Sequence, residues 1–251
     1  MRRLGNLSDK QCCEFGAWDG KHLSNTYNLI ANRNYEAILI EGDIKKFNEL
    51  NINFTNKKII KINKFVNFTG EDTLDNILGK THFNLDFDFL SIDIDGLDYY
   101  IFESLYKFTP KLICIEFNPT IGKNVNFVQE KNIKIRAGSS AKSLIDLGVK
   151  KDYFPIASTT CNLFFIHNKF KKFITNSDKF NINEILLDLY DNFLFFDYDG
   201  KVFTSKPTII VKIINFFSFK IIQILLRFDR LIHNPIKYLT KLKYLFVKKF
   251  K

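Results

Sequence analysis

The chain has 251 residues, 46% of them hydrophobic and 25% charged, and its 37 basic and 27 acidic residues give a net charge of +10. This length and composition indicate one soluble globular domain with a full-sized core and room for an appendage. The first ten residues, MRRLGNLSDK, lead into no apolar segment, so we expect no secretory signal and a cytoplasmic protein.

The four cysteines show no CxxC or zinc-finger spacing, which argues against a structural metal site. Cys13, Cys114 and Cys161 fall in apolar runs that we interpret as strands, and Cys12 directly precedes Cys13. We therefore expect small, buried, reduced side chains.

Up to residue 167, short apolar runs alternate with polar segments of helical character. The connections are roughly 15 to 25 residues long, which is enough for a crossover helix between parallel strands. Runs that are apolar on both faces are typical of central parallel strands covered by helices. The predicted strands are residues 11–15, 36–41, 58–63, 87–94 and 111–117.

The segment SSAKSLIDLGVKK (139–151) has a serine N-cap and apolar residues at helical spacing. Two further predicted strands, 153–158 and 162–167, are joined by a short turn at Thr160–Cys161 and form an antiparallel hairpin. Five βα-type units, a helix and a terminal hairpin are the layout of a class I methyltransferase sheet. We therefore predict an α/β, Rossmann-like fold with a mostly parallel, seven-stranded sheet.

The stretch EFGAWDG directly follows the first predicted strand and holds two glycines four positions apart, Gly16 and Gly20. Ligands of doubly wound folds bind at the carboxyl ends of the strands, where glycine lets the backbone approach a ligand that a Cβ would push away. The spacing is not the GxGxxG that opens a dinucleotide-binding helix onto a pyrophosphate. Glu14, ahead of the first glycine, instead suits a cationic or amine-bearing ligand. An ordinary strand-to-helix turn is the alternative.

The second predicted strand ends in Ile40-Glu41-Gly42-Asp43, with an acid at its carboxyl end. In this class of fold such a carboxylate accepts hydrogen bonds from both ribose hydroxyls of a nucleoside. A solvated turn carboxylate is the alternative, but the acid and glycines on the preceding strand favour a ligand. After the third strand, residues 68–74 supply polar groups where the adenine would lie.

Several runs in this order resemble the FkbM-type branch of S-adenosylmethionine-dependent methyltransferases: EFGAWDGKHLSNTYNLI, AILIEGD, FLSIDIDGLDYYIFESL, PKLICIEFNPTIG and GSSAKSLIDLG. The resemblance spans about residues 11–167 and implies bound S-adenosylmethionine and O-methylation of a sugar or another hydroxylated small molecule. It departs at the start, where only about ten residues precede the first strand, so we expect the helix or lid ahead of it to be short or missing.

The resemblance also implies a set of cofactor-contacting positions. We add Asp93, at the end of the fourth predicted strand, although it could instead point into the sheet and cap neighbouring backbone. The positions that the resemblance itself implies are Glu14, Gly16, Asp19, Gly20, Glu41 and Asp72.

The fourth and fifth predicted strands carry the candidates for chemistry. Asp95 and Asp98 follow the fourth strand, and Glu116 and Asn118 lie at the end of the fifth. On adjacent parallel strands these groups converge beside the methyl-donor pocket. A hydroxyl that attacks a sulfonium needs alignment and an acceptor for its proton, which Asp95 or His22 could be.

Two other interpretations of these residues stay open. The same oxygens could hold a hard divalent cation such as magnesium or manganese, which we favour less, or could serve the fold alone. His22, directly after Lys21, could be a residue at a helix terminus and nothing more.

The basic charge is concentrated in the last part of the chain. Residues 201–251 hold ten Lys and two Arg against one acid, so residues 1–200 are nearly neutral. After Pro207 the basic and polar positions fall on one side of a helix and apolar residues fill the rest. We predict a methyltransferase domain over 1–206 and a basic amphipathic helical tail over 207–251.

Such a tail is typical of a helix that lies on an anionic membrane surface, and its lysines argue against a spanning helix. Packing against the body or a partner is the alternative. The aromatic residues lie on the apolar face, which argues against nucleic acid as the partner.

These observations predict an S-adenosylmethionine-dependent methyltransferase that acts on a small-molecule or glycan acceptor, peripheral to the inner face of the cytoplasmic membrane. An NAD-dependent oxidoreductase on a similar sheet is one alternative, disfavoured by the glycine spacing. A non-enzymatic membrane-surface or nucleic-acid-binding module that acts through the tail is another.

Overall fold

The computed structural model describes residues 8–173, 185–186, 194–196 and 202–204. The chain divides into two compact units, Met1–Leu189 and Tyr190–Lys251. The predicted tail, residues 207–251, lies outside the described residues, so its helices and its contact with a membrane stay predictions, as does the boundary at residue 206. No helix among the described residues is long and apolar enough to cross a membrane.

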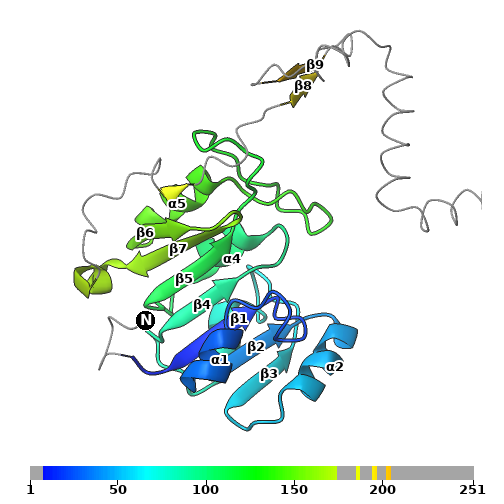
Figure 1. The fold of residues 1–251 in the computed structure, drawn as a ribbon, viewed down its shortest axis with the longest axis vertical. Helices are drawn as coiled ribbons and strands as arrows, with labels where there is room; N and C mark the ends of the chain where they lie inside the picture. Colours follow the sequence, from blue (N-terminus) through cyan, green and yellow to red (C-terminus); the bar gives the residue numbers. More distant parts are fainter. Residues whose placement is uncertain (1–7, 174–184, 187–193, 197–201, 205–251) are drawn as a thin grey trace, which may run out of the picture. The chain divides into compact units, whose positions relative to one another are not determined.

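The first unit holds a seven-stranded sheet with the strand order β3-β2-β1-β4-β5-β7-β6 (Figure 1). Strands β1 to β5 are parallel, and β7 is antiparallel to both β5 and β6. The predicted parallel sheet with a terminal hairpin is therefore confirmed. The strands are β1 (Gln11–Phe15), β2 (Glu36–Glu41), β3 (Ile59–Asn63), β4 (Phe89–Ile92), β5 (Leu112–Glu116), β6 (Tyr153–Ser158) and β7 (Asn162–His167).

Helices connect the parallel strands, and a 3₁₀ helix follows the hairpin. These are α1 (Tyr27–Arg33), α2 (Ile44–Asn53), α3 (Leu74–Leu78), α4 (Asp98–Ser104), α5 (Ala141–Lys150) and η2 (Asn168–Phe173). The predicted Ser140 N-cap is confirmed, because its side chain accepts a hydrogen bond from the backbone N–H of Ser143. The second unit contains two short antiparallel strands that the sequence did not predict, β8 (Leu194–Phe196) and β9 (Val202–Thr204).

Alternate residues of the strands pack against helices on opposite faces of the sheet. Cys13 of β1 and Ile38 of β2 belong to a core cluster with apolar residues of α3, α4 and α5. Cys12 and Leu39 belong to a second cluster with Leu50 of α2. Because both faces are covered, the strands are apolar throughout rather than alternating, as the sequence predicted.

The predicted strand 87–94 is shorter in the structure. The strand begins at Phe89, although the backbone of Asp88 still forms hydrogen bonds with Gln11 and Leu112. The buried carboxylate of Asp88 accepts hydrogen bonds from the backbone N–H groups of Asp9 and Lys10. At the other end Asp95 has φ +59°, a left-handed conformation that ends the extended run.

The cysteines are free thiols, and Cys12, Cys13 and Cys114 are fully buried as predicted. Burial raises the pKa of each of these three thiols above its ordinary value, which keeps them protonated. The expectation for Cys161 was wrong: it is half-buried in the turn between β6 and β7, because Asn162 is the first residue that pairs in the ladder.

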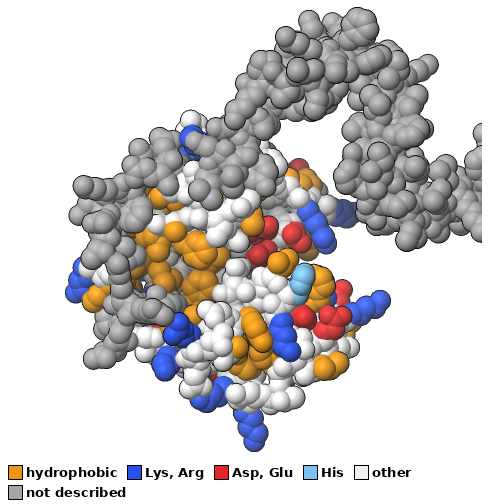
Figure 2. Space-filling model, in the orientation of Figure 1, with side chains coloured by type: hydrophobic (Ala, Val, Ile, Leu, Met, Phe, Trp, Pro, Cys, Tyr) orange, Lys and Arg blue, Asp and Glu red, His pale blue; other side chains and the backbone are white. Residues whose placement is uncertain are grey.

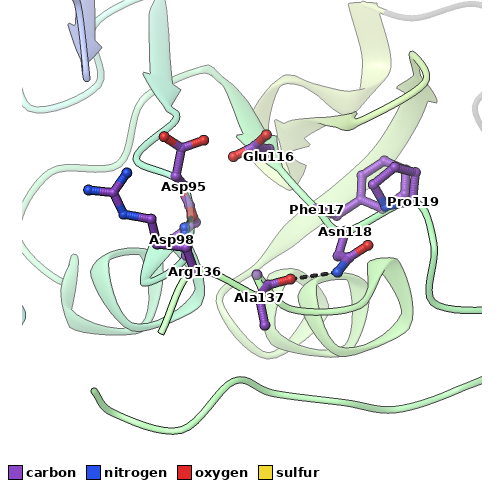
Figure 3. A pocket seen from close by; sticks show the side chains of 10 residues that line it. Asp95, Asp98, Glu116, Phe117, Asn118, Pro119, Arg136 and Ala137 are labelled. Carbon is purple, nitrogen blue, oxygen red and sulfur yellow. Dashed lines mark hydrogen bonds between the residues drawn. The ribbon is translucent and has the colours of Figure 1, made fainter. Parts of the chain in front are cut away.

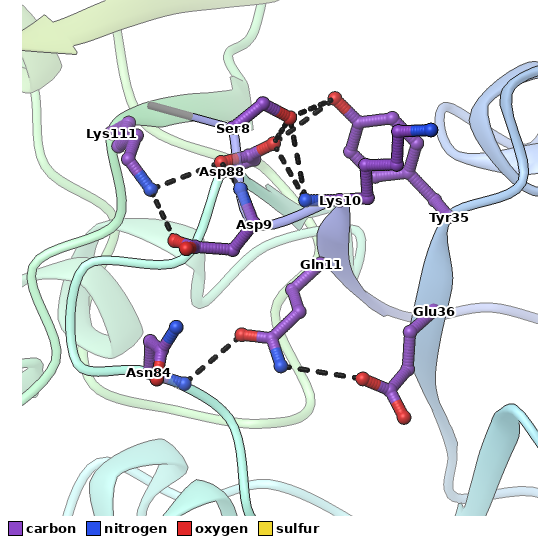
Figure 4. Close-up of polar contacts among 9 residues, drawn as sticks. All are labelled: Ser8, Asp9, Lys10, Gln11, Tyr35, Glu36, Asn84, Asp88 and Lys111. Atoms are coloured by element: carbon purple, nitrogen blue, oxygen red, sulfur yellow. Dashed lines mark hydrogen bonds and ion pairs between the residues drawn. The ribbon is translucent and has the colours of Figure 1, made fainter. Parts of the chain in front are cut away.

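A buried polar network joins the amino ends of β1, β4 and β5, on the edge of the sheet away from the glycine turn (Figure 4). The Asp88 carboxylate, fully buried, accepts hydrogen bonds from Tyr35 Oη at 3.0 Å and from Ser8 Oγ. The ammonium of Lys111 lies 3.0 Å from Asp88 and 2.5 Å from Asp9. Burial alone would lower the pKa of Lys111, but hydrogen bonds and charge from both carboxylates outweigh it and raise the pKa.

Candidate functional site

The carboxyl ends of the parallel strands form one edge of the sheet. These strands point to the right in Figure 1, and acidic side chains gather on that side in Figure 2. The strand order reverses at β1, which has β2 on one side and β4 on the other. Ligands of open α/β sheets bind outside the carboxyl ends of the strands at such a switch point, so the ends of β1 and β4 mark the candidate site.

Gly16, the first residue after β1, lies against the backbone that follows β4. Its φ is +82°, and a Cβ built there would lie 1.9 Å from the carbonyl oxygen of Asp93. Only glycine permits this approach. The sequence predicts that a ligand requires this glycine, and the structure adds a reason within the chain itself: Gly16 lets β1 and β4 end side by side.

Gly20 closes the same turn onto the end of α2. Its φ is +74°, and a Cβ there would lie 2.4 Å from the ring of Phe54 and 2.8 Å from Leu50. The two glycines therefore fix the course of residues 16–20 against a strand and a helix. A ligand contact at Gly20 stays a prediction.

Asp19 and His22 shape the exposed part of this turn. The Asp19 carboxylate accepts hydrogen bonds from the backbone N–H groups of Lys21, at 2.9 Å, and His22, at 2.7 Å. The exposed His22 ring lies edge-on to Trp18, with 5.2 Å between ring centroids. His22 does not line the acidic pocket described below, so the structure does not bring it together with Asp95.

Glu14 is buried and bonded to the start of α1. Its carboxylate accepts hydrogen bonds from Ser24 Oγ at 2.5 Å, from Thr26 Oγ1 at 2.6 Å and from the backbone N–H of Asn25 at 2.7 Å. Burial raises the pKa of Glu14, although these three hydrogen bonds oppose the shift. Glu14 therefore anchors the segment after the glycine turn, and its contact with a cofactor stays a prediction.

Glu41 lies at the end of β2 and holds the glycine turn from the other side. One carboxylate oxygen accepts a hydrogen bond from the backbone N–H of Trp18 and the other from that of Asp43, both at 2.8 Å. An ionised carboxylate has about four acceptor positions, so each oxygen keeps one that no described residue fills. Those two positions match what the two hydroxyls of a ribose would need.

Asp72 lies in the loop after β3, where the sequence placed the adenine. One of its oxygens forms an ion pair with Lys64. Asn67 donates its backbone N–H to the Asp72 carbonyl oxygen at 2.8 Å, which closes the loop on itself. The structure thus assigns Asp72 a role in the loop, and its contact with a cofactor stays a prediction.

A cavity of about 370 Å³ opens at the ends of β4 and β5 (Figure 3). Four of the predicted catalytic residues line it: Asp95, Asp98, Glu116 and Asn118. In Figure 3, Asp95, Asp98 and Arg136 lie on one side and Asn118 and Pro119 on the other. The predicted convergence of the two strand ends is therefore confirmed.

Three carboxylates crowd together at the ends of β4 and β5. One oxygen from each of Asp93, Asp95 and Glu116 lies within 4.8 Å of the others. Burial and then the neighbouring carboxylates raise the pKa of Glu116 to about 8. Burial and Asp95 raise the pKa of Asp93, while a hydrogen bond from Glu116 opposes that shift.

The raised pKa of Glu116 favours its protonated form, which can donate a hydrogen bond to Asp93. The alternative way to relieve such crowding is a divalent cation bridged by the same oxygens. Asp93 therefore belongs to the carboxylate cluster through its side chain and to the glycine turn through its carbonyl oxygen.

Asp98 is fully buried at the start of α4 and shapes the loop that presents Asp95. Its two oxygens accept hydrogen bonds from the backbone N–H groups of Ile94, at 3.0 Å, and Gly96, at 2.9 Å. Burial raises the pKa of Asp98 to about 7 despite these bonds. The prediction of a catalytic role for Asp98 is not tested, but its geometry is that of a positioning group.

Asn118 forms hydrogen bonds on the side of the pocket opposite Asp95. Its amide donates to the Ala137 carbonyl oxygen at 2.5 Å, and its side-chain oxygen accepts hydrogen bonds from the backbone and hydroxyl of Thr120. These bonds leave the amide of Asn118 engaged with the loop between β5 and α5.

Three residues of that loop, Arg136, Ala137 and Gly138, complete the pocket, a role that the sequence did not predict. Nor did the sequence predict a role for Gln129, which is buried within the loop and makes side-chain hydrogen bonds to three of its residues. A polar residue inside a segment without hydrophobic periodicity gives no pattern from which its burial could be predicted.

The proton on Glu116 predicts a pH-dependent stability. Between about pH 4.5 and about pH 8 the folded chain keeps a proton that the unfolded chain has released, so this group makes the free energy of unfolding fall as pH rises. Glu116→Gln should match wild type at low pH and exceed it near pH 8 by about 1 kcal/mol, after discounting for the solvent exposure of the group.

Urea unfolding of both proteins across this pH range tests the expectation. Glu71→Gln, at an exposed glutamate, is the matched control and should shift the stability equally at every pH. A wild-type and Glu116→Gln difference that is independent of pH would show that Glu116 is ionised in the folded chain.

Comparisons with known proteins found similarity only among solved structures. No family model and no curated protein matches the chain. A structure titled a pericyclic reaction enzyme has a TM-score of 0.42 and 11% identity, over 66% of this chain and 46% of that one. The CMeT domain of the citrinin polyketide synthase has a TM-score of 0.43 and 12% identity, over 63% of this chain and 47% of that one. A SAM-dependent methyltransferase from Aquifex aeolicus has a TM-score of 0.38 and 10% identity, over 63% of this chain and 82% of that one.

The chain spans about half the length of the first two of these structures. With such low identities and TM-scores, the matches assign neither a family nor an activity to this chain.

Proposed function

We propose that the chain is an S-adenosylmethionine-dependent methyltransferase. The observation that carries the proposal is Glu41, a buried carboxylate at the end of β2 with one acceptor position left on each oxygen, beside the glycine turn after β1. A ribose with two free hydroxyls fits these positions. The spacing of the two glycines differs from that of a pyrophosphate-binding turn, and three acids lie near it: Glu14, Asp19 and Glu41. Both features argue against binding of a pyrophosphate and therefore of NAD.

The described residues fit this cofactor in three respects. Glu41 would accept the ribose hydroxyls, and the exposed backbone of Gly16 leaves room for a ligand over the turn. Asp93, whose backbone lies against Gly16 and whose carboxylate lies within 4.8 Å of those of Asp95 and Glu116, connects the glycine turn to two residues of the pocket. When bound, the cofactor would supply an activated methyl group on a positively charged sulfonium.

The acceptor in this proposal is a hydroxyl of a sugar, a glycan or another small molecule in the acidic pocket. Asp95 is exposed there and held by the loop that Asp98 anchors, so its carboxylate can take a proton from the acceptor. Glu116 keeps a proton at neutral pH, which makes it a hydrogen-bond donor rather than the base.

Replacing Glu41 tests the proposal. Glu41→Ala should lower the affinity for S-adenosylhomocysteine at least about tenfold, because it removes charge-assisted hydrogen bonds of about 1.5–3 kcal/mol each. Calorimetric titration of wild type with S-adenosylmethionine, S-adenosylhomocysteine and NAD should show binding of the first two and none of NAD.

Glu36→Ala, at the other end of β2, is the matched control and should bind S-adenosylhomocysteine as wild type does. Glu41→Gln, which keeps the shape and one acceptor oxygen, should lose less affinity than the alanine variant. A folded Glu41→Ala protein with wild-type affinity would refute the assignment of Glu41 to the ribose.

A further inference from the structure

Arg136 is the one cationic side chain among the described residues that line the acidic pocket. It lies on the loop between β5 and α5, beside Asp95 and Asp98 (Figure 3). None of the ion pairs found among the described residues involves it, although three carboxylates, Asp95, Asp98 and Glu116, line the same cavity. Its guanidinium therefore keeps its five N–H donors for a ligand.

The backbone on both sides of Arg136 is held by one buried residue. The Gln129 amide oxygen accepts hydrogen bonds from the N–H groups of Ala137 and Gly138, both at 2.8 Å. The Gln129 amide nitrogen donates to the Ile135 carbonyl oxygen, also at 2.8 Å. These three bonds hold the backbone on both sides of residue 136, whereas its side chain forms no hydrogen bond or ion pair with a described residue.

Gln129 also fixes this loop against the rest of the pocket. Its carbonyl oxygen accepts a hydrogen bond from Tyr100 Oη of α4 at 2.6 Å. A Cβ on Gly96, in the loop that carries Asp95, would lie 3.2 Å from the Gln129 amide, so the two loops are in contact. The pocket thus has one wall of carboxylates and one rigid loop that presents a guanidinium.

A cationic group in such a pocket would be expected to pair with the nearest carboxylate. Both oxygens of one of these carboxylates, Asp98, are engaged, because they accept hydrogen bonds from the backbone N–H groups of Ile94 and Gly96. A guanidinium that forms no ion pair with the described carboxylates offers the planar, two-pronged geometry that matches a carboxylate or a phosphate.

We propose that the acceptor carries an anionic group, a carboxylate or a phosphate, which Arg136 binds while the hydroxyl to be methylated faces Asp95. This inference rests on the proposed function for the identity of the pocket. It narrows the acceptor from hydroxylated small molecules in general to acidic ones, such as sugar acids or phosphorylated sugars.

Chemical modification of arginine tests the proposal on the full, unmutated chain. Phenylglyoxal reacts with free guanidinium groups, and peptide mass spectrometry reports the rate at each arginine separately. The reaction is run in sodium chloride, sodium acetate or sodium phosphate at equal ionic strength and pH. Arg33, exposed on α1 and away from the pocket, is the internal control.

Acetate, phosphate or both should slow the modification of Arg136 at least about threefold relative to Arg33, since charge-assisted, bidentate pairing occupies the guanidinium. Protection by acetate alone assigns the carboxylate, and protection by phosphate alone assigns the phosphate. Equal rates in all three salts, or equal protection of Arg33, overturn the proposal.

The affinity for S-adenosylhomocysteine is measured in the same three salts. Binding of this ligand without protection of Arg136 refutes the anionic acceptor and leaves the methyltransferase proposal intact. Protection of Arg136 without binding of the ligand supports an anion site and refutes the methyltransferase.

Discussion

Gly16→Ala is expected to destabilise the folded chain by about 2–5 kcal/mol in all. A residue with a Cβ at φ +82° costs about 1–2 kcal/mol. The Cβ would also lie 1.9 Å from the Asp93 carbonyl oxygen, which is backbone and cannot rotate away, so β1 and β4 must separate. Overpacking of this kind costs about 1–3 kcal/mol more.

Gly70→Ala is a matched control for this substitution. Gly70 has φ +77°, and nothing lies within 4 Å of the Cβ position, so the variant carries the conformational cost without the clash. Urea unfolding should show a loss of about 1–2 kcal/mol for Gly70→Ala and clearly more for Gly16→Ala. Equal losses in the two variants would mean that β1 and β4 do not meet at Gly16.

Gly16 also shows what could be predicted from the sequence and what could not. The strands, their order of appearance and the closing hairpin follow from local patterns, because a strand covered on both faces must be apolar along its length. The need for glycine after β1 could be predicted as well. Its closest neighbour could not, because Asp93 is far away in sequence and is brought there by the pairing of β1 with β4.

In the acidic pocket, too, some features could be predicted from the sequence and others could not. Asp95 and Glu116 could be expected to converge, since the carboxyl ends of parallel strands meet at one edge. The difference in exposure and pKa between these two carboxylates could not be predicted. Asp95 is exposed, whereas Glu116 is partly buried and has a raised pKa. Burial and the neighbouring charges of Asp93, Asp95 and Asp98 set the pKa of Glu116, and these depend on how the two strand ends pack together.

The second large effect is expected at the amino ends of the strands, where Lys111→Met should cost about 3–5 kcal/mol of stability. The Asp88 carboxylate is fully buried, and Lys111 is its only cationic partner among the described residues. The methionine fills a similar volume but leaves the buried charge of Asp88 without a counter-charge. Lys80→Met, at an exposed lysine, is the matched control and should change the stability by less than about 0.5 kcal/mol.

The double variant Asp88→Asn with Lys111→Met separates the charge from the other contacts of the network. Asparagine keeps one of the two side-chain oxygens, enough for the N–H group of either Asp9 or Lys10 but not both, and removes the charge that Lys111 balances. The double variant should therefore be more stable than the sum of the two single losses predicts, by about 1–3 kcal/mol. Additive losses would show that the Asp88–Lys111 pair contributes no coupling.

The affinity for S-adenosylhomocysteine distinguishes stability from function in these variants. Asp88 directly precedes β4, whereas Asp93 directly follows it, so the network and the candidate site lie at opposite ends of one strand. Lys111→Met should consequently bind S-adenosylhomocysteine as tightly as wild type at any temperature at which it remains folded. A loss of affinity in the folded variant would mean that the amino-end network positions the acidic pocket through β4, because β4 is the element that the two ends share.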